Sequence, residues 1–137
     1  MAFMSINGLA ELMQDLDAAS ADLSECSEEI CTKSGEIIKE EQRKVGMSMG
    51  VHRTGETLGS LEVTPFAKSV SGGSVKIQFA GTNSDGNPNT EVAFVNEFGK
   101  LNQPARPFIA TANETSEAAT IKVALDAVDR HLRKHNL

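Results

Sequence analysis

Two of the three histidines have the spacing of a metal-binding pair. His131 and His135 lie four residues apart, which places two imidazoles on one face of a helix, where they can share a metal ion. However, no glutamate stands beside His131, no third ligand is apparent, and Arg133 and Lys134 add repelling positive charge. We therefore predict no metal site.

The third histidine, His52, stands close in sequence to the hydroxyls of Ser48, Thr54 and Ser60. A hydroxyl beside a histidine base is the starting arrangement of nucleophilic catalysis. The sequence has neither the strand–turn–helix pattern that exposes such a nucleophile nor a carboxylate motif that orients the base. We therefore predict no enzymatic activity, no catalytic residue and no cofactor.

Cys26 and Cys31 lie in a segment that reads as a helix. Five residues of helix turn the chain by roughly 140° beyond a full turn, so the two thiols occupy different faces. A disulfide needs side chains that point toward each other. We predict two reduced cysteines that pack as small apolar residues.

The 137 residues fit one domain, spanning residues 1–137. No uncharged apolar run reaches the roughly 18 residues of a membrane span, and the N-terminus lacks the basic start of a signal peptide. We expect a protein without membrane association that folds in the cytoplasm of whatever cell makes it.

The net charge of −6 is carried by residues 1–45, which hold ten acidic and four basic side chains. Residues 46–137 hold nine of each, and the basic ones gather at the end, around Arg130–His135. Copies of the chain can pack acidic part against basic part, or the basic end can simply match the helix dipole. Weak non-specific DNA contact is a rival reading, although the acidic pI and the lack of basic–aromatic interleaving disfavour it.

Hydrophobic periodicity predicts an α+β fold. Residues from Ile6 to about Met47 read as helix, either two helices with a break near Asp17–Ser20 or one kinked helix. Leu9, Leu12, Leu16, Leu23, Cys26, Ile30, Ile37, Ile38 and Val45 form its apolar stripe.

A small antiparallel sheet is expected next. One strand runs from Leu58 to Pro65, a turn covers Ser71–Ser74, and Val75–Phe79 alternates apolar and polar residues. Thr90–Phe98 fits a strand or a short helix. The polar loops 46–57 and 81–89 are the expected partner-binding elements; the alternative is that they are merely disordered tips.

The last helix is predicted from Phe108 to about His135, with Pro107 in its first turn. We expect it to pack on the sheet through one apolar face, formed by Phe108, Ala112, Ile121, Leu125, Val128 and Leu132. Phe94, Phe98 and Phe108 are interpreted as core residues, since phenylalanine is the only aromatic residue in the chain. The alternative for one of them is that it anchors a contact between subunits.

Three segments, in this order, carry a resemblance to a known family: HRTGETLGSLEV (52–63), EVAFVNEFGK (91–100) and PARPFIATANE (104–114). Together with the helical lead-in they resemble the head–tail joining family of tailed phages, also described as neck or tail-completion proteins. The structural signature comprises Thr54, Gly55, Glu97, Phe98, Gly99, Pro104, Arg106, Pro107 and Phe108. The chain departs from the pattern in having no proline before the TG loop, Asn96 before Glu97, and Lys100 after Gly99.

The resemblance implies a structural virion protein and no active site. Such a protein joins the head connector to the tail of a phage or prophage particle as one subunit of a ring of about six copies. Its implied partners are copies of itself and other neck and tail proteins, namely a connector or stopper and a tail terminator or tube. DNA would pass nearby without specific binding. A tail-like bacteriocin can use the same module, and a regulatory or toxin-like module of a mobile element is the alternative function.

Within the signature, Arg106 is flanked by two prolines, Pro104 before it and Pro107 after it, which restrict the backbone on either side. We hypothesise that Arg106 forms a charge-assisted pair with Glu97, either buried or exposed. Gly99, after an apolar run, is expected to need a positive φ angle or a close backbone approach.

Overall fold

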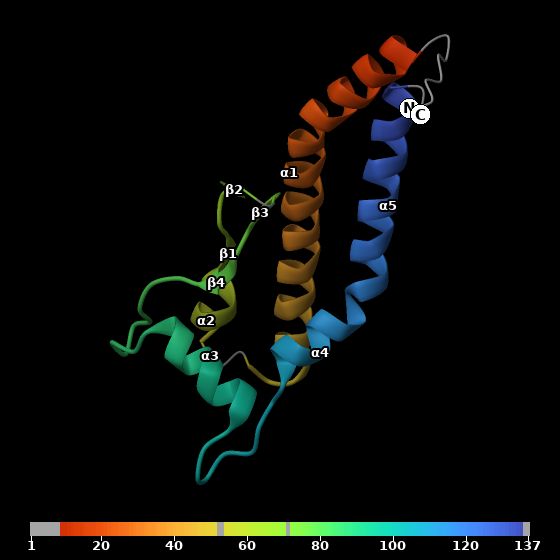
Figure 1. Cartoon of the computed structure of the whole chain (residues 1–137). Helices are drawn as coiled ribbons and strands as arrows, with labels where there is room; N and C mark the ends of the chain where they lie inside the picture. The colour runs from red at the N-terminus through yellow and green to blue at the C-terminus, as the bar shows by residue number, and fades with distance from the viewer. Residues whose placement is uncertain (1–8, 52–53, 71, 136–137) are drawn as a thin grey trace, which may run out of the picture.

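The computed structural model describes residues 9–51, 54–70 and 72–135. Before Glu25, side chains are described only at Met13, Gln14, Asp17 and Ala18. The predicted α+β fold is confirmed, with a long N-terminal helix, a small antiparallel β region and C-terminal helices (Figure 1). The elements in order are α1 (Leu9–Ser48), α2 (Glu56–Gly59), β1 (Leu61–Val63), β2 (Ala67–Ser69), β3 (Gly72–Ser74), β4 (Ile77–Phe79), α3 (Asn89–Phe98), α4 (Phe108–Thr115) and α5 (Glu117–Lys134).

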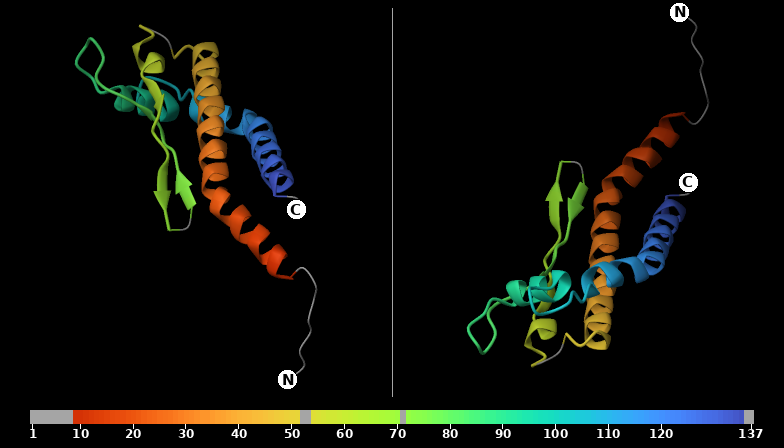
Figure 2. Two further views of the ribbon diagram at one scale, coloured as in Figure 1. Left: turned by 90° about the horizontal axis from the view of Figure 1, so that it is seen from above. Right: turned by 90° about the horizontal axis from the view of Figure 1, so that it is seen from below.

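The N-terminal segment is one helix, α1, whose first part bends toward the side on which α5 lies (Figures 1 and 2). Of the two alternatives in the sequence, the single kinked helix is therefore the one that forms. The side chains of Leu9, Leu12, Leu16 and Leu23 lie outside the described residues. Farther along α1, Cys26 is buried and Ile30 is half-buried, as the apolar stripe predicts.

The β region is an antiparallel hairpin, as predicted, but in two short pieces. β1 pairs with β4 in the register Leu61 to Phe79, and β2 pairs with β3 nearer the tip (Figure 2). Leu58 belongs to α2 rather than to the first strand, and 72–74 form β3 rather than a turn.

Two glycines of α1 let the β region and the C-terminal helices come close. A Cβ atom at Gly35 would lie 2.9 Å from a methyl group of Val63, and one at Gly46 would lie 2.7 Å from Leu58 and 3.2 Å from Phe108. The two glycines are eleven residues apart, about three helical turns, so they share one face of α1. That face receives the hairpin and the core.

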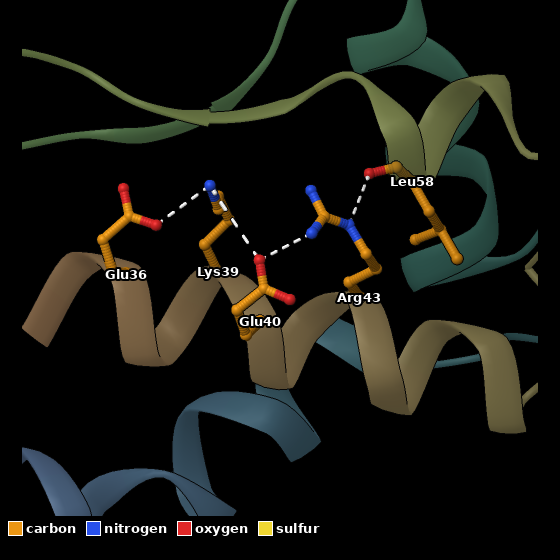
Figure 3. Close-up of polar contacts among 5 residues, drawn as sticks. All are labelled: Glu36, Lys39, Glu40, Arg43 and Leu58. Carbon is orange, nitrogen blue, oxygen red and sulfur yellow. Dashed lines mark hydrogen bonds and ion pairs between the residues drawn. The ribbon is translucent and has the colours of Figure 1, made fainter.

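The side chain of Arg43 connects α1 to the end of α2. A ladder of ion pairs runs along the surface of α1, from Glu36 through Lys39 and Glu40 to Arg43, with separations of 2.9, 3.9 and 2.6 Å (Figure 3). Arg43 Nε then donates to the carbonyl oxygen of Leu58 at 3.5 Å. The ladder orients the guanidinium toward the last turn of α2, where carbonyl groups lack helical partners.

The core lies where the C-terminal end of α1 meets α2, α3, α4 and the base of the hairpin. Its buried members are Val51, Leu58, Leu61, Ala93 and Phe108. The ring of Phe108 is fully buried and meets Phe79 edge to face, with centroids 6.0 Å apart. The prediction that Phe108 is a core residue is confirmed.

The predicted C-terminal helix is interrupted at Ser116, so α4 and α5 run in different directions (Figure 1). The hydroxyls of Thr115 and Ser116 donate back to the carbonyls of Ala112 and Asn113. Hydroxyl groups that bond the preceding turn bend helices. α5 then runs antiparallel to α1, and Arg130 pairs with Glu29 at 2.6 Å.

The apolar face of α5 was predicted to point inward, and this prediction is wrong. Ala127 is buried against α1, whereas Ile121, Leu125, Val128 and Leu132 are 50, 65, 40 and 40 % exposed. The bend at Ser116 redirects the helix, and the small side chain of Ala127 packs against α1. None of the helices formed by the described residues has the length and apolar character that a bilayer crossing requires.

Candidate functional site: a polar groove beside an exposed phenylalanine pair

The two loops that the sequence singled out meet at one groove. It has a volume of about 580 Å³ and lies between the segment after α1, the loop before α3, and α3 itself with the turn that follows it. We call it the polar groove; it is lined by Gly50, Val51, Thr54, Gly55, Thr57, Asn83, Asp85, Asn87, Glu91, Val92, Val95, Asn96, Lys100, Gln103 and Arg106. The predicted loop 46–57 is shorter than expected, because α1 extends to Ser48 and α2 begins at Glu56.

The loop before α3 has a defined conformation. Asn83 Oδ1 accepts hydrogen bonds from the backbone N–H groups of Asp85 and Asn87, at 3.0 and 2.9 Å. Gly86 has a φ of 84° within this turn. Glu56 of α2 accepts from both the backbone N–H and the hydroxyl of Ser84 at 3.0 Å. The two sides of the polar groove are therefore tied to each other.

The buried side chain of Asn89 holds together the elements that form the groove. It is 4 % exposed, its side-chain nitrogen donates to the carbonyl of Ala80 at 2.8 Å, and its oxygen accepts from the hydroxyl of Thr57 at 3.3 Å. Buried polar groups are stable only when bonded in this way. Asn89 thus joins the start of α3 to both α2 and the end of β4.

The hypothesised pair between Arg106 and Glu97 is wrong. Arg106 instead bonds Asn96: its Nη1 donates to Asn96 Oδ1 at 3.2 Å, and its backbone N–H donates to the carbonyl of Asn96 at 2.6 Å. Gln103 adds a weaker bond to the same side-chain oxygen, at 3.4 Å. Asn96, which stands before Glu97 in the sequence, is the acceptor for the arginine.

The carboxylate of Glu97 caps α4. Glu97 is 7 % exposed, and its oxygens accept the backbone N–H groups of Ile109 and Ala110 at 2.8 and 3.1 Å. These N–H groups in the first turn of α4 have no acceptor within the helix. A carboxylate also complements the positive end of the helix dipole. Glu97 therefore fixes where α4 begins relative to α3, and Pro107 lies at the cap position rather than within the first turn.

Gly99 has both properties that its position predicted. Its φ is 78°, and a Cβ atom there would lie 2.8 Å from both the nitrogen of Ala105 and the carbonyl oxygen of Gln103. The chain leaves α3 at this glycine and turns back, with Lys100 and Gln103 bonded to each other through their backbones. This reversal brings Arg106 to the groove.

Phe94 and Phe98 are not core residues. They are 61 and 68 % exposed, and their rings contact each other with centroids 4.8 Å apart. Leu101, in the turn that follows α3, is 98 % exposed. The buried side of α3 instead holds Asn89, Ala93, Asn96 and Glu97, whose polar groups are satisfied by the contacts above. We call Phe94, Phe98 and Leu101 the apolar rim.

The signature residues thus do not form one site. Thr54, Gly55 and Arg106 line the polar groove. Glu97, Gly99, Pro107 and Phe108 organise the chain behind it, while Phe98 belongs to the apolar rim and Pro104 is exposed. Gly55, with a φ of 77°, starts α2, and the hydroxyl of Thr54 accepts the backbone N–H of Glu56 at 3.3 Å.

The charges that line the polar groove are balanced. Asp85 and Glu91 oppose Lys100 and Arg106. A site for a nucleic-acid backbone would instead carry an excess of basic groups. The groove offers amide, hydroxyl and charged groups of both signs, which suits a polar segment of a protein.

The described histidines and cysteines, which are His131, His135, Cys26 and Cys31, lie away from the groove. His52 lies outside the described residues. The rings of His131 and His135 are 5.1 Å apart on α5, and the described residues form no cluster of three histidine, cysteine or acidic side chains that would hold a metal ion. Both thiols are free; burial, with a smaller contribution from the Glu29 carboxylate, raises the pKa of Cys26.

Sequence reasoning missed the buried polar residues Asn89 and Asn96 and the capping role of Glu97. Apart from the carbonyl of Val92, which accepts from the side chain of Asn96 one helical turn earlier, their partners lie 7 to 32 residues away in the chain, and no local pattern marks them. Comparison with known proteins yields no match to a family model, a curated protein or a solved structure.

Proposed function

We propose that this protein is a structural subunit of a tailed-phage or prophage particle, a neck or tail-completion protein that joins the head connector to the tail. The observation that carries the proposal is the apolar rim beside the polar groove. The rings of Phe94 and Phe98 contact each other at the surface of the chain, tilted by 48°, and Leu101 in the turn that follows is 98 % exposed. Such a surface is typical of proteins that work by docking.

The distribution of hydrophobic residues supports an assembling protein. Among the described residues, ten large hydrophobic side chains are exposed and eight hydrophobic ones are buried. Monomeric proteins rarely expose contiguous apolar patches larger than roughly a few hundred Å², and aromatic residues at a surface are typical anchors of protein–protein contacts. Burial of the apolar rim by a partner would remove this surface from water.

The polar groove supports the same kind of contact. Its groups are hydrogen-bonding and charge-balanced, and its two loops are tied by Glu56 and Ser84. A preformed groove costs less conformational entropy on binding than a disordered loop would. We expect it to receive a segment of a neighbouring neck or tail protein, while the apolar rim anchors the contact.

The expected partners are other copies of the chain in a ring of about six, a connector or stopper on the head side, and a tail terminator or tube on the tail side. The DNA that passes through the neck would not be bound specifically. The basic end of α5 is engaged within the chain at Arg130, which pairs with Glu29, and at Arg133, which pairs with Asp129 at 3.0 Å. Neighbouring portal, capsid and tail genes would separate this role from a regulatory or toxin-like one.

The test is a Phe94→Ser/Phe98→Ser double variant in the phage or prophage that carries the gene. Anchor residues of an interface contribute about 2 kcal/mol each, and 1.4 kcal/mol corresponds to tenfold in affinity. We expect docking to weaken by about 100-fold or more, so that electron microscopy shows filled heads and separate tails. The free energy of unfolding of the purified variant should lie within about 0.5 kcal/mol of the wild-type value, since both rings are exposed.

The matched control is Val70→Ser, which removes an exposed apolar side chain at the tip of the hairpin. It should leave particle assembly unchanged. Joined, infectious particles formed in the complete absence of the protein would contradict the neck role itself. Joined particles formed with the double variant would contradict the part assigned to the apolar rim.

A further inference from the structure

α5 carries an apolar stripe that the fold leaves uncovered. Ile121, Leu125, Val128 and Leu132 are 40 to 65 % exposed, and they lie about 130° around the helix from Ala127, which packs on α1. We call these four residues the α5 seam. The polar groove and the apolar rim lie on other elements, so the seam is a separate surface.

The spacing of the α5 seam is that of a helix–helix packing interface. Its members are separated by four, three and four residues, the alternation with which paired helices interlock. The order four–three–four reads the same in both directions along the helix. A second α5 laid antiparallel therefore places Leu125 against Val128 of the other copy, and Ile121 against Leu132, twice over.

The charges beside the α5 seam complement one another in the same arrangement. Lys122 and Asp129 are both exposed and flank the seam on the side away from α1. In the antiparallel pair, Lys122 of one copy lies near Asp129 of the other, and the two-fold axis produces this contact twice. Asp129 also pairs with Arg133 in its own helix, so two cations would share that carboxylate.

The overall charge also favours α5 as the place where two copies meet. The chain has a net charge of −6, and α1 alone holds ten acidic and four basic side chains. α5 holds three acidic and four basic ones, so it is nearly neutral. Two copies of an acidic protein repel least along such a face.

From the spacing and the charges we infer that the α5 seam binds the α5 seam of a second copy, which gives an antiparallel two-fold dimer of the free protein. The contact is isologous, so it closes at two copies. It does not depend on the neck role, and its surface is distinct from the apolar rim. Four side chains cover less than the roughly 800 Å² per partner of a standard interface, so we expect a dissociation constant on the order of 10 to 100 µM.

The experiment measures the mass of the purified full chain by sedimentation equilibrium between about 1 µM and 1 mM. We expect a monomer–dimer equilibrium, and Leu125→Asp should weaken it at least 100-fold, since each copy would place a carboxylate in the seam. Circular dichroism and the unfolding midpoint should stay near wild type because Leu125 is 65 % exposed. A monomer throughout, or a dimer that Leu125→Asp leaves intact, overturns the inference.

Charge reversal tests the antiparallel arrangement. Lys122→Asp alone and Asp129→Lys alone should each weaken the dimer about tenfold, whereas the combined variant should return to within about threefold of wild type. Lys68→Asp, an equal charge change on the exposed strand β2, is the control and should have no effect. If the combined variant does not recover the affinity of the wild-type dimer, the two-fold geometry is overturned. A species larger than a dimer that is abolished by Leu125→Asp would overturn it as well.

Discussion

At the scale of single residues, the buried carboxylate of Glu97 is the contact on which the start of α4 depends. Its two oxygens accept the N–H groups of Ile109 and Ala110, which have no acceptor within the helix. Arg106, which the sequence assigned to this carboxylate, bonds Asn96 instead. Two acceptors adjacent in the chain compete for one arginine, and only the three-dimensional course of the turn after Gly99 decides between them.

Glu97→Ala should destabilise the protein by roughly 3 kcal/mol, because two hydrogen bonds to a charged acceptor are lost and both donors stay in a part-buried site. Glu97→Gln should lower the free energy of unfolding by less, since the amide keeps one oxygen that can accept a hydrogen bond. Equilibrium urea unfolding, followed by circular dichroism, measures both changes. Glu91→Ala on the exposed side of α3 is the control and should change stability by less than about 0.5 kcal/mol. Equal effects at the two positions would show that Glu97 does not act as the cap.

At the scale of elements, hydrophobic periodicity predicted the kind of structure better than the direction in which it faces. The long first helix, the hairpin and the helical character of the C-terminus are confirmed. The segment Thr90–Phe98, left open between strand and helix, is helix α3. The exposure of Phe94 and Phe98 was not predictable, because α3 buries its polar face through hydrogen bonds that come from distant parts of the chain.

The same reason explains α5. Its apolar stripe was read as the inward face, yet Ala127 makes the contact with α1. Periodicity identifies a face that avoids water but does not say whether the chain itself or another molecule covers it. The break at Ser116, produced by hydroxyl groups that bond the preceding turn, determines how α5 is rotated.

Gly99, at the C-terminal boundary of α3, combines a positive φ with a close backbone approach. Gly99→Ala should destabilise the protein by about 3 kcal/mol, since an alanine with a φ of 78° is strained and its Cβ would lie 2.8 Å from two backbone atoms. Gly59→Ala in α2 has open space and no positive φ, so it should stay within about 0.5 kcal/mol of wild type. Thermal unfolding of the two variants compares them directly. Similar midpoints would contradict the close approach at Gly99.

At the scale of the whole molecule, the ion pair between Glu29 and Arg130 joins α1 to α5 across 101 residues of sequence. Hydrogen bonds from Lys33 first, and then from Arg130, hold the pKa of Glu29 below its ordinary value of 4.5. A carboxyl group with a lowered pKa stabilises the fold when it is ionised. That contribution is complete above the ordinary pKa and is lost as the pH falls through the lowered one.

Glu29→Gln should therefore be less stable than wild type near pH 7, by a small amount because the pair is exposed. The difference should shrink as the pH falls below 4.5. Unfolding midpoints measured from pH 7 to pH 3 give this difference. Glu28→Gln, one residue away on the exposed side of α1, should show no such pH dependence relative to wild type. A difference that grows in acid would contradict the sign of the shift.

The pairing of α1 with α4 and α5 also sets an order of events during synthesis. α1 leaves the ribosome early, but the helices that cover it are made roughly 70 to 100 residues later, as the contacts of Glu41 with Thr115 and of Glu29 with Arg130 show. At about 5 to 20 residues per second, α1 waits roughly 4 to 20 seconds for its partners. During that time its apolar stripe is open to chaperones or to α1 of a neighbouring nascent chain. Of the two surfaces assigned to docking, the apolar rim is made during this wait and the α5 seam only at its end.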